Sequence, residues 1–332
     1  MPAPPAQVTA PDDPGVWATP VDRSIRKKLR LAGAITGGLL VLAAFAVVLT
    51  RGNEFGRALS ALASPSPAAL GALLAAVVGT TMLTTIAMLV LIRRFGRVEF
   101  GEMFRLVCAS TLGNFLPLQP GLAGRVAYHH LVNRIKVQQS VLSIAEATMV
   151  SLTAVVMLAG SLWLVHRQMR FTGSEAHAWW LPLLAGLLAL PLLPWPSLRP
   201  FAFALLARWL DLLLWALRAW ACFALVGQEI SPSTALAFAC VAMLANLVPF
   251  IGNGLGIREW AVGLLATPLA GVSVEAGLAA ELVGRAAELI FFVPAGLVAS
   301  RGIIRRLRSA LAERMQAQSA AARIARESHG AG

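Results

Sequence analysis

The chain has 332 residues, 58% of them hydrophobic and 13% charged, and its formal net charge is +12. Its mean hydropathy of +0.72 lies far above that of soluble domains, which excludes a water-soluble globular protein. The basic residues flank apolar stretches, where anionic lipid headgroups are the nearest partner, so we do not expect binding to nucleic acid.

The N-terminal segment differs from the rest in composition. Residues 1–22 hold six prolines and few apolar residues, and a basic cluster follows them, so residues 1–30 are predicted to be a disordered, basic, cytosolic tail. The first apolar run, 31–50, is longer than the roughly 7–15 residues of a signal peptide's apolar region. We therefore predict an uncleaved first membrane helix.

Six apolar runs approach the length of roughly 20 residues that a membrane helix needs: 31–50, 68–92, 141–165, 178–194, 201–226 and 276–300. The predicted fold is all-α and polytopic, with six to eight transmembrane helices in a single domain over 31–300. Basic residues gather before the first run, around 93–105, and in the C-terminal segment 301–332. By the positive-inside rule these regions are cytosolic, and 301–332 is a second basic cytosolic tail.

A short motif occurs twice, as Leu-x-Asn-x-x-Pro around Asn114 and around Asn246, in a chain with only five asparagines. A glycine-bearing turn and an arginine, Arg125 or Arg258, follow each copy. An Ala-Glu pair comes later in both halves, at Glu146 and Glu281. The pattern predicts a duplicated unit, with one repeat over about 31–165 and the other over about 178–300.

The two segments with the motif, 105–118 and 233–251, can be interpreted in two ways. If both enter the membrane and return, each half has three crossings and the repeats are inverted, as in many transporters. If both cross fully, the halves have four spans each and share one orientation. We favour the inverted arrangement, because it places Arg125, Arg134 and Lys136 on the cytosolic side.

The glycines after the second motif indicate an anion site. Gly252, Gly254 and Gly256 precede an apolar stretch from Ile257, so their amides would lie at a helix N-terminus, beside Arg258. The first copy repeats this around Arg125 with fewer glycines. The alternative is that both are ordinary loops, each with an arginine at the membrane interface.

Several charges fall inside apolar runs, where they must face the protein interior. Glu281, Arg285 and Glu288 have the spacing i, i+4, i+7 and so share one helix face. They form a salt bridge between helices, or serve as a counter-charge to Arg125 or Arg258, or include a proton-linked carboxylate. Arg208 and Asp211 are predicted to pair. Arg218 has no partner on its own helix and is a candidate phosphate ligand.

No nucleophile elbow, metalloprotease motif or Walker loop is present in the sequence, and its three cysteines lack metal spacing. We expect no catalytic residue, metal or cofactor, and we do not expect an enzyme. A membrane glycosyltransferase ranks last, since the predicted outer loops offer only isolated acidic residues.

The motif pairs, above all Gly254-Leu255-Gly256-Ile257-Arg258-Glu259, resemble the lysylphosphatidylglycerol synthase transmembrane (flippase-like) family over about residues 30–300. The resemblance implies a multi-pass protein of the bacterial inner membrane that moves lipids or lipid-linked precursors. Some members carry a soluble aminoacyltransferase domain, which we expect this chain to lack.

The leading hypothesis is translocation of a lipid or lipid-linked precursor with an anionic or phosphate-bearing headgroup. Arg258 and Arg125 would contact the headgroup, and Glu259 and Glu281 would orient the arginines or link the movement to protons. The alternative is a non-transporting scaffold or accessory subunit of a lipid-modifying enzyme. The candidate substrate-binding residues are Asn114, Arg125, Arg218, Asn246, Gly254, Gly256, Arg258, Glu259, Glu281 and Arg285.

Overall fold

The structure, a computed structural model, is a bundle of helices. It describes residues 35–36, 38–44, 46–47, 65–115, 120–172, 180–247 and 252–330. Within these ranges all regular structure is helical, and four helices are long and apolar enough to cross a membrane: α3 (Pro67–Ile92), α6 (Val137–Thr172), α8 (Arg199–Leu225) and α11 (Val274–Gly330). They coincide with four of the six predicted runs, and they indicate a membrane protein.

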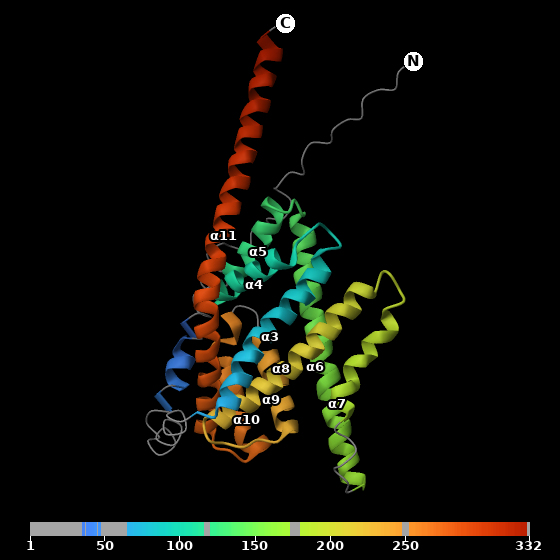
Figure 1. Ribbon diagram of the computed structural model, residues 1–332, viewed down its shortest axis with the longest axis vertical. Helices are drawn as coiled ribbons and strands as arrows, with labels where there is room; N and C mark the ends of the chain where they lie inside the picture. The colour runs from blue at the N-terminus through green and yellow to red at the C-terminus, as the bar shows by residue number, and fades with distance from the viewer. Residues whose placement is uncertain are drawn as a thin grey trace.

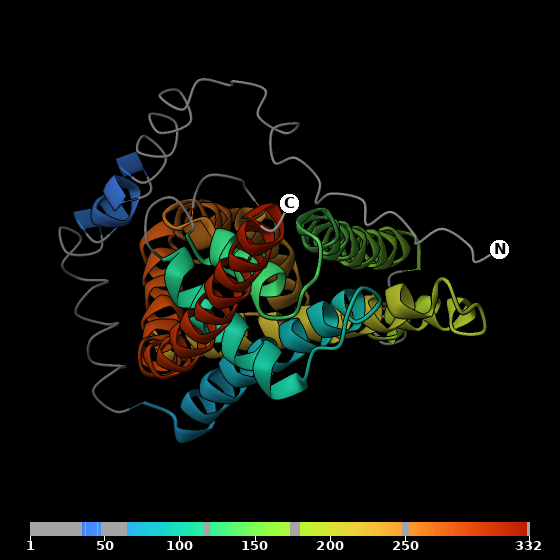
Figure 2. The same ribbon diagram turned by 90° about the horizontal axis from the view of Figure 1, so that it is seen from above.

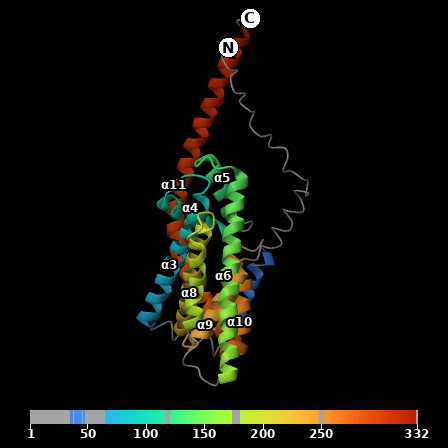
Figure 3. The same ribbon diagram turned by 90° about the vertical axis from the view of Figure 1, so that its right-hand side faces the viewer.

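Two helical hairpins connect these long helices. In the first, α4 (Phe100–Asn114) is followed by α5 (Pro120–Leu131); in the second, α9 (Pro232–Asn246) is followed by the short 3₁₀ turn η3 (Gly252–Gly254) and α10 (Ile257–Ala270). As the motif predicts, α4 and α9 end at the repeated asparagines. Figures 1 and 3 show α4 and α5 toward one end of the bundle and α9 and α10 toward the other.

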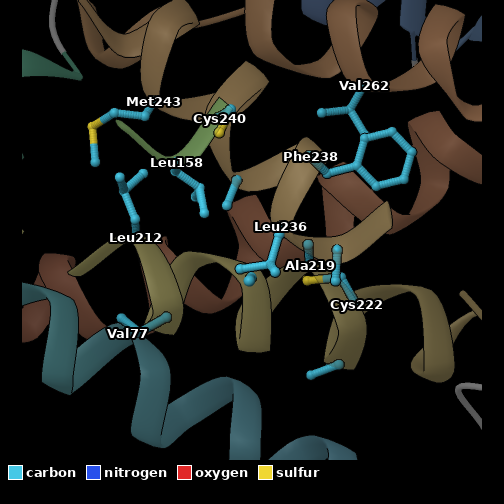
Figure 4. Close-up of a cluster of buried hydrophobic side chains, with 14 of the residues drawn as sticks. Val77, Leu158, Leu212, Ala219, Cys222, Leu236, Phe238, Cys240, Met243 and Val262 are labelled. Atoms are coloured by element: carbon cyan, nitrogen blue, oxygen red, sulfur yellow. The ribbon is translucent and has the colours of Figure 1, made fainter. Parts of the chain in front are cut away.

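The apolar core is shared by both halves of the chain. Figure 4 shows Val77 of α3 and Leu158 of α6 near Leu212 of α8, with Phe238 of α9 and Val262 of α10 in the same cluster. Helix α8 packs along α3, while α11 lies against α4 and α5, as the view from above shows (Figure 2). The long helices of one half are therefore packed against those of the other, and they hold both hairpins.

The predicted run 178–194 does not form one spanning helix. It forms α7 (Trp180–Leu184) and a 3₁₀ helix, η2 (Ala185–Leu192), with Pro191 inside the latter. Pro182 and Pro191 have no backbone N–H to donate, which shortens regular helix there. The predicted tail 1–30 and most of the run 31–50 lie outside the described residues, so the number of crossings beyond four stays a prediction.

The C-terminal segment is helical rather than an irregular tail. Helix α11 runs without interruption from the last apolar run through the basic segment to Gly330, although Pro294 lies within it. Its 57 residues correspond to about 85 Å at 1.5 Å per residue. Its C-terminal part extends beyond the other helices (Figures 1 and 3).

Candidate functional site

A cavity of about 260 Å³ lies inside the bundle, where the two hairpins approach each other. Threonines of α3 and residues of α6 line its sides, and side chains from α4, α5, α8, α9, η3, α10 and α11 complete it. Its polar lining is dominated by hydroxyl, amide and guanidinium groups, from Thr80, Thr81, Thr84, Thr111, Thr148, Ser151, Asn114, Asn246, Asn253, Arg125, Arg208, Arg218 and Arg258, with Asp211 and Glu288 as the acids.

The two helix breaks meet at this cavity. The side-chain amide of Asn253, in the second break, donates to the carbonyl of Thr111 in the last turn of α4, at 3.4 Å. Phe115, directly after α4, lies against Phe292 of α11. Segments more than 130 residues apart thus form one wall, an arrangement that transporters with broken helices use for their substrate sites.

The repeated asparagines have the same local contact in both copies. The Oδ1 atom of Asn114 faces Gly121, and that of Asn246 faces Gly254; a Cβ atom on these glycines would lie 2.6 Å and 3.0 Å from the respective oxygens. Neither oxygen has a hydrogen-bond partner among the described residues. Each motif therefore folds the chain back closely onto its own asparagine, which only a glycine at that position permits.

The N-terminus of α10 is not open to an external anion. Glu259 is completely buried, and its Oε2 atom accepts a hydrogen bond from the Gly256 amide at 2.7 Å. A carboxylate in the first turn of a helix satisfies the exposed amides and the dipole, as an anion would. The chain's own Glu259 thus fills the site that we predicted for a ligand at these glycines.

Six buried charges form one network around Glu288 of α11. Its Oε1 accepts from Arg258 at 2.9 Å and from Arg218, and its Oε2 accepts from Arg285 at 2.9 Å. Two further carboxylates complete the network: Glu281 accepts from Arg258 at 2.8 Å, and Glu259 accepts from Arg285 at 2.7 Å. Three arginines face three glutamates, so the network is electrically balanced.

Two arginines of this network line the cavity and retain donors without a partner. The Nη2 atoms of Arg258 and Arg218 are buried and have no acceptor within the described part of the chain. Both guanidinium groups lie over the ring of Trp215, at 5.3 Å and 4.7 Å from its centre. They are held rigidly by glutamates on one side and by an aromatic face, so their remaining N–H groups are preorganised donors.

The predicted pair of Arg208 and Asp211 is present on α8. The Nη1 atom of Arg208 donates to Asp211 at 2.7 Å and to Thr84 of α3 at 3.0 Å. Both residues are buried and line the cavity, so Arg208 does not extend to the bundle surface. This pair is a second balanced unit beside the network.

Arg125 is in a different environment. It is buried at 6% exposure, and its side chain contacts Ser110 and the sulfur of Met88, both uncharged. Its Nε has no hydrogen-bond partner, and no carboxylate pairs with it among the residues that the structure describes. Glu146, which follows the first motif as Glu281 follows the second, pairs with Arg94 instead.

The chain matches no family model and no curated protein. The resemblance to the lysylphosphatidylglycerol synthase transmembrane family therefore stays a prediction, and the geometry of the cavity carries the functional argument.

Of the predicted site residues, five line the cavity: Asn114, Arg125, Arg218, Asn246 and Arg258. Three lie behind it as partners of arginines or of one another: Glu259, Glu281 and Arg285. Gly254 and Gly256 form the turn before α10, with φ angles of 62° and 82°.

Sequence reasoning left the centre of the network out of the predicted site. Glu288 binds three arginines, but the sequence pattern predicted only that it shares a helix face with Glu281. This i, i+7 spacing was the signal that could have placed Glu288 in the site. The threonines of α3 were also missed. Thr80, Thr81 and Thr84 recur at helical spacing inside an otherwise apolar run, which is a sign of a polar face in a membrane helix.

Proposed function

We propose that this protein translocates a lipid, or a lipid-linked precursor, with an anionic or phosphate-bearing headgroup across the membrane. The observation that carries the proposal is the cavity inside the bundle. Four arginines line it, and each has a buried side-chain nitrogen without a partner among the described residues: Arg125, Arg208, Arg218 and Arg258. Guanidinium groups with free donors bind phosphate oxygens well, and a buried site strengthens that interaction.

Two further features support the proposal. The helix breaks meet at the cavity, and the hairpins lie toward opposite ends of the bundle, which fits an inverted repeat with access from either side. Basic residues of 93–105 and 301–308 are proposed to face the cytosol in the bacterial inner membrane. The headgroup would pass through the cavity while the acyl chains stay in the bilayer.

A modification that fills the cavity after folding tests this directly. Thr148 and Met149 of α6 are both exposed, but only Thr148 also lines the cavity; Met149 is 61% exposed and does not line it. Reconstituted Thr148→Cys protein is expected to invert a tail-labelled anionic lipid until N-ethylmaleimide modifies the cysteine, and then to lose the activity. Met149→Cys, modified to the same extent by mass spectrometry, is expected to keep it.

The balanced network of six charges favours a second candidate, a scaffold for a lipid-modifying enzyme, in which the arginines are purely structural. The two functions predict different results in this lipid-inversion assay. Absence of inversion by unmodified protein in vesicles with anionic lipid favours the scaffold. Inversion that persists after Thr148→Cys is modified places the lipid path outside the cavity.

A further inference from the structure

The buried charges at the cavity do not cancel. Around the cavity and directly behind it lie five arginines and four carboxylates: Arg125, Arg208, Arg218, Arg258, Arg285, Asp211, Glu259, Glu281 and Glu288. One positive charge is left over. The other buried carboxylate of the described residues, Glu102, does not line the cavity and pairs with Arg306 at 3.8 Å. Burial lowers the pKa of neighbouring His129, so its imidazole is neutral at pH 7 and does not change this balance.

The surplus charge can be assigned to one residue. Three arginines and three glutamates are joined in the network around Glu288, and Arg208 is joined to Asp211. Arg125 remains, with only Ser110 and Met88 beside it and with Arg208 near enough to repel it. A buried charge without a counter-charge is costly, and a ligand that supplies the counter-charge offsets that cost.

From this balance we infer that the cavity is matched to a single negative charge, that of a lipid phosphodiester, with Arg125 as its counter-ion. The inference rests on the proposed function and narrows its substrate class. A phosphomonoester brings up to two negative charges and would leave one unbalanced. A zwitterionic headgroup adds an ammonium group, and both acids that line the cavity, Asp211 and Glu288, are already paired with arginines.

The geometry of the donors agrees with a phosphodiester. Its two non-bridging oxygens can each accept several hydrogen bonds. Arg125, Arg218 and Arg258 line the cavity, and each has a side-chain nitrogen without a partner among the described residues. Arg125 and the two network arginines come from opposite hairpins and from α8. A bound phosphodiester would therefore connect the two halves of the bundle.

The experiment compares tail-labelled lipids of different headgroup charge in phosphatidylcholine vesicles: phosphatidylglycerol with one negative charge, phosphatidylcholine with none, and phosphatidic acid with up to two. We expect wild-type protein to invert phosphatidylglycerol fastest. Arg125→Gln is expected to slow this about ten- to a hundredfold. Arg305→Gln removes the same charge from an exposed position on α11 and is expected to leave the rate unchanged.

A second variant tests whether the net charge at the cavity matters, rather than the identity of Arg125. Asp211→Asn releases Arg208 from its partner, so Arg125→Gln with Asp211→Asn again has one surplus positive charge in the same cavity. We expect the double variant to recover most of the lost rate. Asp211→Asn alone, with two surplus charges, is expected to raise inversion of phosphatidic acid relative to phosphatidylglycerol.

The possible failures are distinguishable. If wild-type protein inverts none of the lipids, the proposed function fails. If it inverts all three alike, or if the double variant stays as slow as Arg125→Gln, translocation stands and the charge matching is wrong. If it binds inorganic phosphate in vesicles of phosphatidylcholine, while lipid inversion is independent of headgroup charge, Arg125 serves a soluble anion and the lipid assignment is overturned.

Discussion

The two hairpins are alike in backbone and different in charge. Helices α4 and α9 are both 15 residues long, both end at the repeated asparagine, and both are followed by a glycine packed against that asparagine. In the second copy, however, Arg258 binds two glutamates, whereas Arg125 in the first copy has none among the described residues. The two breaks are therefore alike, and the charges beside them differ.

This difference in charge assigns different tasks to the two motif arginines. Arg258 is fixed from three sides, by Glu281, Glu288 and Trp215, so its main contribution is to hold α8, α10 and α11 together. Arg125 contributes little to internal pairing and is the arginine that a ligand can neutralise. From the sequence alone the second copy looked like the stronger anion site, because its glycine motif is more complete; in the structure those glycines are capped by Glu259.

The largest expected effect is a difference in the free energy of unfolding between variants of Arg258 and of Arg125. Arg258→Gln leaves Glu281 buried without its partner, and breaking a buried ion pair on one side costs about 3–5 kcal/mol. Arg125→Gln removes an unpaired charge and is expected to leave the free energy of unfolding unchanged or to raise it. Unfolding of both variants in detergent, followed by circular dichroism against denaturant, measures the difference.

A loss of stability in Arg125→Gln as large as that in Arg258→Gln would show that Arg125 has a strong internal partner, and the two copies would then be equivalent in charge.

A smaller effect tests the close contact between the glycine and the preceding helix, which both motifs share. A Cβ atom on Gly121 would lie 1.9 Å from the carbonyl oxygen of Ser110, so Gly121→Ala must push α5 away from α4. We expect a loss of about 1–3 kcal/mol, typical of overpacking. Gly124, on the same helix, has open space around it, and Gly124→Ala is expected to be neutral or to stabilise by up to about 1 kcal/mol.

Thermal melts of the two alanine variants give the comparison. Equal melting temperatures would mean that the close approach of the hairpin helices is not rigid, and the break would lose its proposed role in shaping the cavity.

The helix breaks, the start of α10 and the pair of Arg208 and Asp211 could be predicted because they depend on neighbours in sequence. Proline and glycine act on the backbone where they stand, and i, i+3 or i, i+4 spacing fixes a helix face. The capping of α10 was also predictable in principle, since glycine followed three residues later by glutamate is a capping pattern.

The ion pairs between different helices could not be predicted from the sequence. Arg218 and Glu288 are 70 residues apart, and periodicity states which face a residue occupies but not which helix that face meets. The same holds for Glu146, whose pairing with Arg94 depends on how α6 packs beside the end of α3. The assignment of Arg125 as the surplus charge requires all of these pairings at once.

The smallest expected effect concerns the glutamates that follow the two motifs. Glu146 and its partner Arg94 are partly exposed, with side-chain exposures of 16% and 25%, whereas Glu281 and Arg258 have 9% and 1%. An exposed pair contributes up to about 1 kcal/mol, so Glu146→Gln is expected to cost less than that. Arg94 also lies over the ring of Phe201, 4.7 Å from its centre, and should cost more to replace than Glu146. A double-mutant cycle between Arg94 and Glu146 measures the interaction energy of this pair. A coupling energy as large as that between Arg258 and Glu281 would mean that the glutamate after the first motif also holds helices together. The surplus charge of Arg125 would then be the main difference in charge between the two halves.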